Sequence, residues 1–115
     1  MGGPLPMRMD RAMLVGDAAG HTHPITGGGI HQALEAGRLA GEAAGAFIGG
    51  DKGALERYEP GFMELFSHHL GRAVERRREL VAGLSGVSMA EGAFGPLARR
   101  TWIGFKEYYR KEAER

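Results

Sequence analysis

The stretch from Val15 to Ile30, VGDAAGHTHPITGGGI in one-letter code, holds the residue types best suited to binding a ligand. Asp17 follows a short apolar run, and a carboxylate at the end of a strand can accept hydrogen bonds from a ribose or a polyol. Gly27–Gly29 then opens a helical pattern, and the free N–H groups of residues 28–31 favour an anion or a partial negative charge. A sugar-like chain leading to an electron-accepting ring would fit both halves of the stretch.

Three histidines, His21, His23 and His31, fall within or next to this stretch. Their spacing matches no common zinc pattern and no carboxylate or cysteine completes a ligand set, so the sequence predicts no metal site. His21 or His23 could donate a proton to a bound molecule, but lining a substrate pocket is the stronger interpretation. The sequence therefore assigns no catalytic residue.

The elements that position this stretch can be predicted from local patterns. Ala12–Val15 is an apolar run that ends at Gly16, which predicts one short, buried strand after an irregular lead-in over residues 1–11. Residues 18–26 read as a loop, and a helix is predicted over Ile30–Ile48. Small residues recur on one face of that helix, which implies tight packing against a flat surface such as a sheet: Ala33, Gly37, Gly41 and Ala44.

The second half of the chain is predicted to be helical. Asp51 can cap a helical segment that runs to about Tyr58, and Pro60-Gly61 should break or kink it. A longer helix is predicted over residues 62–84, and a last amphipathic helix is predicted to start at Pro96. Ser88 and Glu91 have the spacing of a capping box, and the aromatic residues of the last segment are more typical of a core than of a cofactor contact: Trp102, Phe105, Tyr108 and Tyr109.

Polar clusters on the long helix allow two interpretations. Its arginines form a basic patch, either a solvated face paired with Glu75 and Glu79 or a contact for anionic lipid headgroups: Arg72, Arg76, Arg77 and Arg78. His68 and His69 are interpreted as a packed or rim pair, because His69 falls on the apolar face.

Composition narrows the class of protein. The chain has 115 residues, a net charge of +1 and no cysteine, which gives no strong field for nucleic acid and excludes disulfides and cysteine-ligated metals. The most apolar stretch, residues 33–48, contains charged side chains, and residues 1–6 do not resemble a signal peptide. We expect a cytoplasmic protein that touches a membrane at most peripherally.

One strand followed by helices cannot satisfy its own backbone groups. The pattern divides into residues 1–50, which hold the strand, the glycine-rich loop and a helix, and a helical region over residues 51–115. We therefore expect this chain to pair with a second chain, to self-associate, or to form part of something larger.

The string GDAAGHTHPITGGGI, followed by HQALEAGRLAGEAA, resembles the second FAD motif of flavin-dependent monooxygenases and geranylgeranyl reductases. The lead-in Gly2–Pro6 is similar to the segment before this motif in the reductases and favours them. The resemblance implies that Asp17 binds the ribityl chain and that Gly16 allows the turn near the pyrophosphate. It places Thr26–Ile30 beside the flavin ring, and the implied cofactor contacts are Gly16, Asp17, Ala18, Pro24, Thr26, Gly27, Gly28, Gly29 and Ile30.

The same resemblance implies a fold and an activity. The isolated chain would be mostly α-helical, and in the complete protein it would form the C-terminal part of an α/β, Rossmann-like flavoprotein of the hydroxybenzoate-hydroxylase type. The complete protein would reduce double bonds of an apolar, geranylgeranyl-type isoprenoid with FAD as cofactor. The G-x-G-x-x-G motif that holds the ADP half of FAD is absent from this sequence, so we do not expect the chain to be active alone.

Three alternatives remain at the level of sequence. The chain could derive from a related flavin monooxygenase or halogenase. It could be a helical interaction module that retains a relic of the flavin motif. It could also be a simple anion- or nucleotide-binding module that uses the glycine-rich start of the helix.

Overall fold

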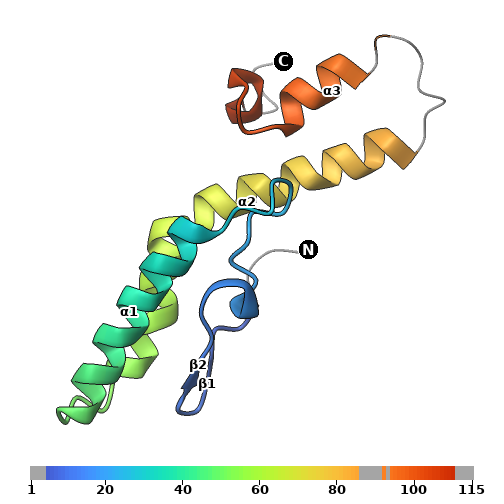
Figure 1. Ribbon diagram of the computed structural model, residues 1–115. Coiled ribbons are helices and arrows are strands. Elements are labelled where there is room, and N and C mark those ends of the chain that lie inside the picture. The colour runs from blue at the N-terminus through green and yellow to red at the C-terminus, as the bar shows by residue number, and fades with distance from the viewer. Residues whose placement is uncertain (1–4, 86–91, 93, 111–115) are drawn as a thin grey trace.

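The computed structural model describes residues 5–85, 92 and 94–110. The molecule is mostly helical and elongated, with principal extents of 62 × 24 × 21 Å. Helices α1 (Ile30–Ile48) and α2 (Tyr58–Ser85) lie side by side, and α2 continues beyond α1 toward α3 (Phe94–Thr101) (Figure 1). Residues 1–4 of the lead-in and the Ser88 and Glu91 capping pair lie outside the described residues.

The N-terminal segment is a small hairpin. Strand β1 (Arg8–Met9) pairs antiparallel with β2 (Ala12–Met13), and Asp10 in the turn has a φ of 51°. The predictions of an irregular lead-in and of a single buried strand over Ala12–Val15 were therefore wrong. A two-residue turn lets the chain pair with itself, which leaves Leu14 and Val15 outside the strand and exposed.

Helix α1 has the bounds predicted from the sequence, because glycines flank both ends of its apolar pattern. It buries Gln32, Ala36 and Ala43. The predicted small-residue face is open at its two glycines: beyond the helix's own backbone, no atom lies within 4 Å of the position that a Cβ would take on Gly37 or Gly41. The tight packing expected of that face is therefore not made within the described residues.

Helix α2 runs without a break through Pro60, so the predicted break at this residue was wrong. Pro60 is the third residue of the helix, where an N–H group needs no partner within the helix. The 3₁₀ helix η2 (Ala54–Arg57) leads directly into α2. Asp51 caps the turn before η2, where its Oδ1 accepts from the Gly53 N–H at 3.1 Å.

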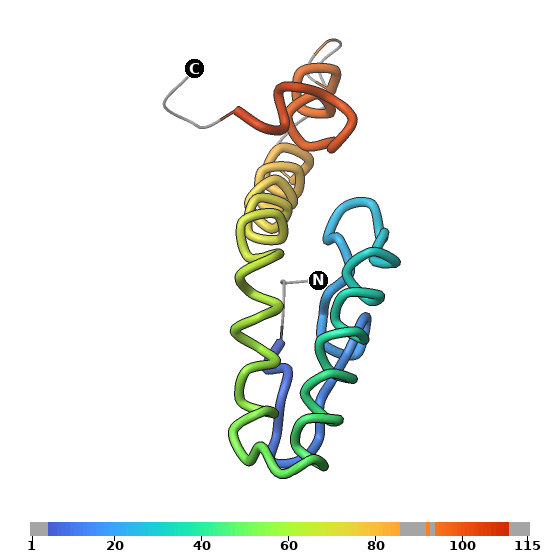
Figure 2. Tube along the Cα trace, turned by 90° about the vertical axis from the view of Figure 1, so that its left-hand side faces the viewer, coloured from blue at the N-terminus to red at the C-terminus, as the bar shows by residue number. Residues whose placement is uncertain are grey.

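The core lies between α1, α2 and the N-terminal segment, which runs alongside both helices (Figure 2). Phe62 on α2 is fully buried, and its ring centroid lies 4.9 Å from that of Phe66. The hairpin segment is attached to α2 by hydrogen bonds, since Tyr58 Oη donates to the Leu14 carbonyl at 2.6 Å and the Met7 N–H donates to a Glu59 oxygen at 3.3 Å.

The C-terminal part differs from the prediction of one amphipathic helix starting at Pro96. Helix α3 begins two residues earlier and ends at Thr101, and the chain then turns into the 3₁₀ helix η3 (Lys106–Tyr109). Tyr108 is fully buried, as predicted for a core aromatic. Trp102, Phe105 and Tyr109 are exposed and are not core residues.

Among the residues that the structure describes, no helix is both long enough and apolar enough to cross a membrane.

Candidate functional site

The two halves of the predicted ligand-binding stretch meet at the start of α1. Asp17 lies on the 3₁₀ helix η1 (Gly16–Ala19), and Gly16 has a φ of 64° that favours glycine. A Cβ on Gly16 would lie 3.4 Å from Ala33 Cβ on α1. A Cβ on Gly29 would lie 3.5 Å from Asp17 Oδ1. The fold thus brings Asp17 beside the first residues of the helix.

Asp17 is exposed and held in one orientation. Thr22 Oγ1 donates a hydrogen bond of 2.6 Å to Asp17 Oδ1. The other carboxylate oxygen makes no hydrogen bond within the described part of the chain, so it can accept from a hydroxyl group of a ligand. Ala18 is exposed next to Asp17.

The glycine-rich segment presents its backbone. Gly27 has a φ of 72°, and the Gly28 N–H donates to Thr26 Oγ1 at 3.2 Å. The first helical bond of α1 runs from the Ala33 N–H to the Gly29 carbonyl, at 2.8 Å. Across the described residues, the N–H groups of residues 29–32 have no hydrogen-bond partner, as is usual for the first turn of a helix. An electron-rich edge of a ligand would be stabilised there.

The predicted site residues differ in exposure. Gly16 and Pro24 are buried and Gly29 is partly exposed. The remaining members of the segment are exposed, and Ile30 is 81% exposed: Thr26, Gly27, Gly28 and Ile30. Gly16 and Pro24 are therefore packing residues in this chain, whereas the exposed members form an open surface at the start of α1.

The loop over residues 23–28 is folded around His23. The His23 N–H donates to the Gly28 carbonyl at 2.7 Å, and the Gly27 N–H donates to the His23 carbonyl at 2.9 Å. His23 Nδ1 accepts from the N–H groups of Ile25 and Thr26, at 3.3 and 3.2 Å. Since Nδ1 is an acceptor, the proton of the neutral ring lies on Nε2. Nε2 then donates to Tyr108 Oη, 3.1 Å away.

The three histidines of the stretch do not converge. His21 is fully buried and stacks on Phe62 with ring centroids 3.8 Å apart, and neither of its ring nitrogens has a hydrogen-bond partner in the described chain. His31 meets the edge of Phe66 at 5.5 Å. Because His21 and His23 are both buried inside this chain, neither lines an open pocket in it.

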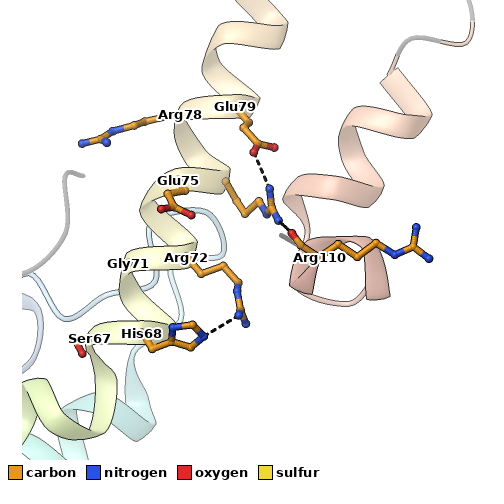
Figure 3. A pocket seen from close by; sticks show the side chains of 9 residues that line it. Ser67, His68, Gly71, Arg72, Glu75, Arg78, Glu79 and Arg110 are labelled. Atoms are coloured by element: carbon orange, nitrogen blue, oxygen red, sulfur yellow. Dashed lines mark hydrogen bonds and ion pairs between the residues drawn. The ribbon is translucent and has the colours of Figure 1, made fainter. Parts of the chain in front are cut away.

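The arginines of α2 do not share one face, which corrects the interpretation as a solvated face, whereas the expected pairing with Glu79 is confirmed for Arg76. Arg76 is buried and paired with Glu79 at 2.6 Å, whereas Arg77 donates to the Pro24 carbonyl at 2.9 Å. Arg78 extends from the side of α2 opposite Arg110 (Figure 3), and both residues line an open groove of about 620 Å³. The groove contains both carboxylates and cations, so it forms no purely basic surface.

The chain is similar in sequence to several reductases. It is 40% identical over 74 residues to digeranylgeranylglycerophospholipid reductase 2 of Methanothermobacter thermautotrophicus, a match that covers 62% of this chain and 19% of the relative. It is 43% identical over 63 residues to the reductase of the same name from Methanosarcina acetivorans, covering 55% and 16%. For the reductase of Methanothrix thermoacetophila, identity is 45% over 69 residues, covering 57% and 18%. This chain is related to the geranylgeranyl reductase family.

No protein-family model and no solved structure matches the chain. The match to the geranylgeranyl reductases covers less than a fifth of each relative named above. The activity in their names is that of the much longer proteins.

In this relative of the geranylgeranyl reductases, the long-range contacts of the loop could not be found from sequence spacing. Tyr108 lies 85 residues from His23, and Arg77 lies 53 residues from Pro24. No motif links the members of either pair. The one available signal was the buried character predicted for the C-terminal aromatics, which did not single out Tyr108.

Buried histidines should make the fold sensitive to acid. Burial lowers the pKa of His21, His23 and His69 below 6.5, and nearby cationic groups add to the effect for His23 and His69. Below pH 6.5 the unfolded chain therefore takes up protons before the folded chain does. The stability contributed by the neutral rings is complete above pH 6.5 and is lost as pH falls toward the lowered pKa values, by at most about 1.4 kcal/mol per pH unit for each proton.

We expect the urea concentration at the unfolding midpoint to decrease when the pH is lowered from 7.5 to 5.5. His21→Leu should reduce this dependence, because leucine keeps an apolar side chain against Phe62 and removes a titrating group. His68→Gln changes an exposed histidine and serves as the matched control. A urea midpoint that stays constant over this range would contradict the expectation.

Proposed function

We propose that this chain forms one wall of an FAD site in a reductase that acts on isoprenoid double bonds. The observation that carries the proposal is the position of Asp17 beside the unpartnered N–H groups at the start of α1. This juxtaposition occurs in a chain related to the geranylgeranyl reductases.

The residues present fit FAD in chemical type and in shape. Asp17 would accept hydrogen bonds from the hydroxyl groups of the ribityl chain. The N–H groups of residues 29–32 would stabilise negative charge at one edge of the flavin ring. Gly27 leaves open space for a flat ligand, since its Cβ position has no neighbour within 4 Å, whereas a Cβ on Gly28 or Gly29 would contact Thr26 Oγ1 at 3.3 Å or Thr22 Cα at 3.4 Å. Bound FAD, in its reduced form, would supply the hydride for the reduction.

The relatives named above favour a reductase over a flavin monooxygenase or halogenase. Each is a reductase by name, and the name specifies a digeranylgeranyl phospholipid as substrate. We therefore propose an apolar isoprenoid as the substrate class of the complete protein. No side chain of this chain is assigned to the proton transfer, because His21 and His23 are buried away from the open surface at the start of α1.

The ADP half of FAD must be bound by residues outside this chain. The sequence has no G-x-G-x-x-G motif, so we propose that the dinucleotide-binding part of the site lies on a segment that corresponds to the rest of the relatives. The exposed segment Thr26–Ile30 would then face both the flavin and that segment.

The proposal can be tested by flavin retention. The chain would be purified alone and after co-expression with the N-terminal remainder of the Methanothermobacter thermautotrophicus relative, then saturated with FAD and desalted. We expect a retained flavin absorbance spectrum with the complementing part present. Asp17→Asn should weaken FAD binding roughly 10- to 100-fold, because it removes a charged hydrogen-bond acceptor.

Asp10→Asn is the matched control for this substitution. Asp10 is an exposed aspartate at the hairpin turn with a positive φ, a conformation that Asn adopts readily. It should leave FAD binding unchanged. If flavin washes through in every preparation, the motif is a relic and the interaction-module alternative becomes the better one. Calorimetric binding of ADP or phosphate without a preference for flavin would instead favour the simple anion-binding module.

A further inference from the structure

The His23 side chain accepts two of the hydrogen bonds that order the glycine-rich loop. Both hydrogen-bonding sites of the His23 ring are used: Nδ1 by the N–H groups of Ile25 and Thr26, and Nε2 by Tyr108 Oη. The ring can fill both roles only as the neutral Nε2–H tautomer. The N–H groups of Ile25 and Thr26 set this tautomer, and the Nε2–H then donates to Tyr108 Oη, which anchors the ring. Tyr108 therefore acts on the loop through His23.

Tyr108 is itself fixed by the long helix. Arg76 Nε donates to the Tyr108 carbonyl at 2.9 Å, and Arg76 Nη2 donates to the Arg110 carbonyl. Glu79 pairs with Arg76 at 2.6 Å and with Arg100 of α3 at 2.9 Å. These bonds hold α3 and η3 against α2. They therefore fix the position from which the Tyr108 side chain contacts His23.

A second contact joins the same regions. Arg77 Nη1 donates to the carbonyl of Pro24, the residue after His23. Two consecutive arginines of α2 therefore hold the two partners of the His23–Tyr108 hydrogen bond: Arg76 contacts the segment of Tyr108, and Arg77 contacts the loop of His23. The ring of His69 on α2 also lies 5.6 Å from that of His23.

We propose that Tyr108 is a positioning residue for the glycine-rich loop over residues 23–28, and that it acts by holding the His23 ring, as the Nε2–H tautomer, where Nδ1 accepts from the loop N–H groups. The consequence for cofactor binding rests on the proposed function, in which this loop leads into the backbone groups that face the flavin. A loop that contains consecutive glycines loses much conformational freedom when it binds a ligand, and a prior constraint reduces that loss. The C-terminal segment thus takes part in the site without touching the ligand.

The tautomer can be measured in the unmodified chain. In ¹⁵N-detected NMR at pH 7.5, we expect His23 to show a protonated Nε2 and an unprotonated Nδ1. A protonated Nδ1 would overturn the proposal, and this measurement does not depend on whether any variant folds.

Tyr108→Phe tests the role of the hydroxyl group, with Tyr109→Phe as the matched control. Tyr109 is the exposed neighbour and its hydroxyl donates to the Ile103 carbonyl at 3.2 Å. We expect Tyr108→Phe to speed amide hydrogen exchange at residues 25–27 by roughly tenfold, the effect of losing one buried hydrogen bond, with no change within α1. Tyr109→Phe should change neither. Equal effects of the two substitutions, or faster exchange throughout α1 as well, would overturn a specific positioning role.

Flavin binding separates this inference from the function on which it rests. If the complemented wild-type protein binds FAD, Tyr108→Phe should weaken that binding by roughly tenfold, and unchanged affinity would overturn the inference. If the wild-type protein binds no flavin, the proposed function fails. The tautomer and the exchange rates of residues 25–27 then decide by themselves whether Tyr108 positions the loop.

Discussion

Replacing Phe62 with Ala should lower the free energy of unfolding by about 3–5 kcal/mol. The Phe62 ring is fully buried and lies between the His21 ring, 3.8 Å away, and the Phe66 ring, 4.9 Å away. Its removal would leave a cavity in the core between α1, α2 and the N-terminal segment. It would also uncover the His21 ring, whose nitrogens have no hydrogen-bond partner among the described residues.

Urea unfolding followed by circular dichroism would measure this loss. Leu65→Ala is the matched control, because Leu65 lies on the same helix and is 53% exposed. That substitution should cost well under 1 kcal/mol, as is usual for an exposed position. If the two variants were equally stable, the stacked contact between Phe62 and His21 would not be part of the core.

The sequence predicted the helices better than the strands because their signals differ in length. Helix α1 spans 19 residues between flanking glycines, so its apolar periodicity was unambiguous and the predicted bounds were confirmed. The hairpin strands have two residues each, which is too short to establish an alternating pattern. Pro60 was misread because the effect of a proline depends on its position in the helix, and the start of α2 could not be located closely enough.

The sequence predicted only part of the candidate site. Asp17 and Gly29 were predicted from a contiguous motif, and the structure brings them together. The contact between His23 and Tyr108 could not be predicted, since it depends on the turn that follows α3 and returns η3 to the core. Local sequence patterns do not predict that the chain turns after α3 and packs η3 against the core.

One face of α1 carries small and apolar residues that are largely uncovered in the described part of the chain. Beyond the helix's own backbone, Gly37 and Gly41 have no neighbouring atom within 4 Å of a Cβ position, and Ile30 and Leu34 on the same helix are 81% and 68% exposed. Each glycine in a helix interior costs roughly 1 kcal/mol relative to alanine. In the proposed reductase, we expect this face to pack against another segment, because its small residues allow close approach.

Arg76→Met should release the C-terminal segment at a cost of about 1.5–3 kcal/mol, because it removes the charged hydrogen bonds that Arg76 donates to that segment. Arg76 is 5% exposed and donates to the carbonyls of Tyr108 and Arg110 while pairing with Glu79. Methionine approximates the length of the side chain but donates no hydrogen bond. The expected loss falls on the docking of α3 and η3 against α2, since those carbonyls belong to η3 and the residue after it.

Limited proteolysis and amide exchange over residues 94–110 would detect this release. Arg78→Met removes the same charge from an exposed position two residues away, so it controls for the change in net charge. We expect rapid cleavage in the α3–η3 segment for Arg76→Met and wild-type resistance for Arg78→Met. Exchange at residues 25–27 should rise together with that in η3, because the loop is held through Tyr108. If the segment detached while the loop kept its protection, His23 would hold the loop without help from the C-terminal segment, and the coupling between the two regions would be wrong.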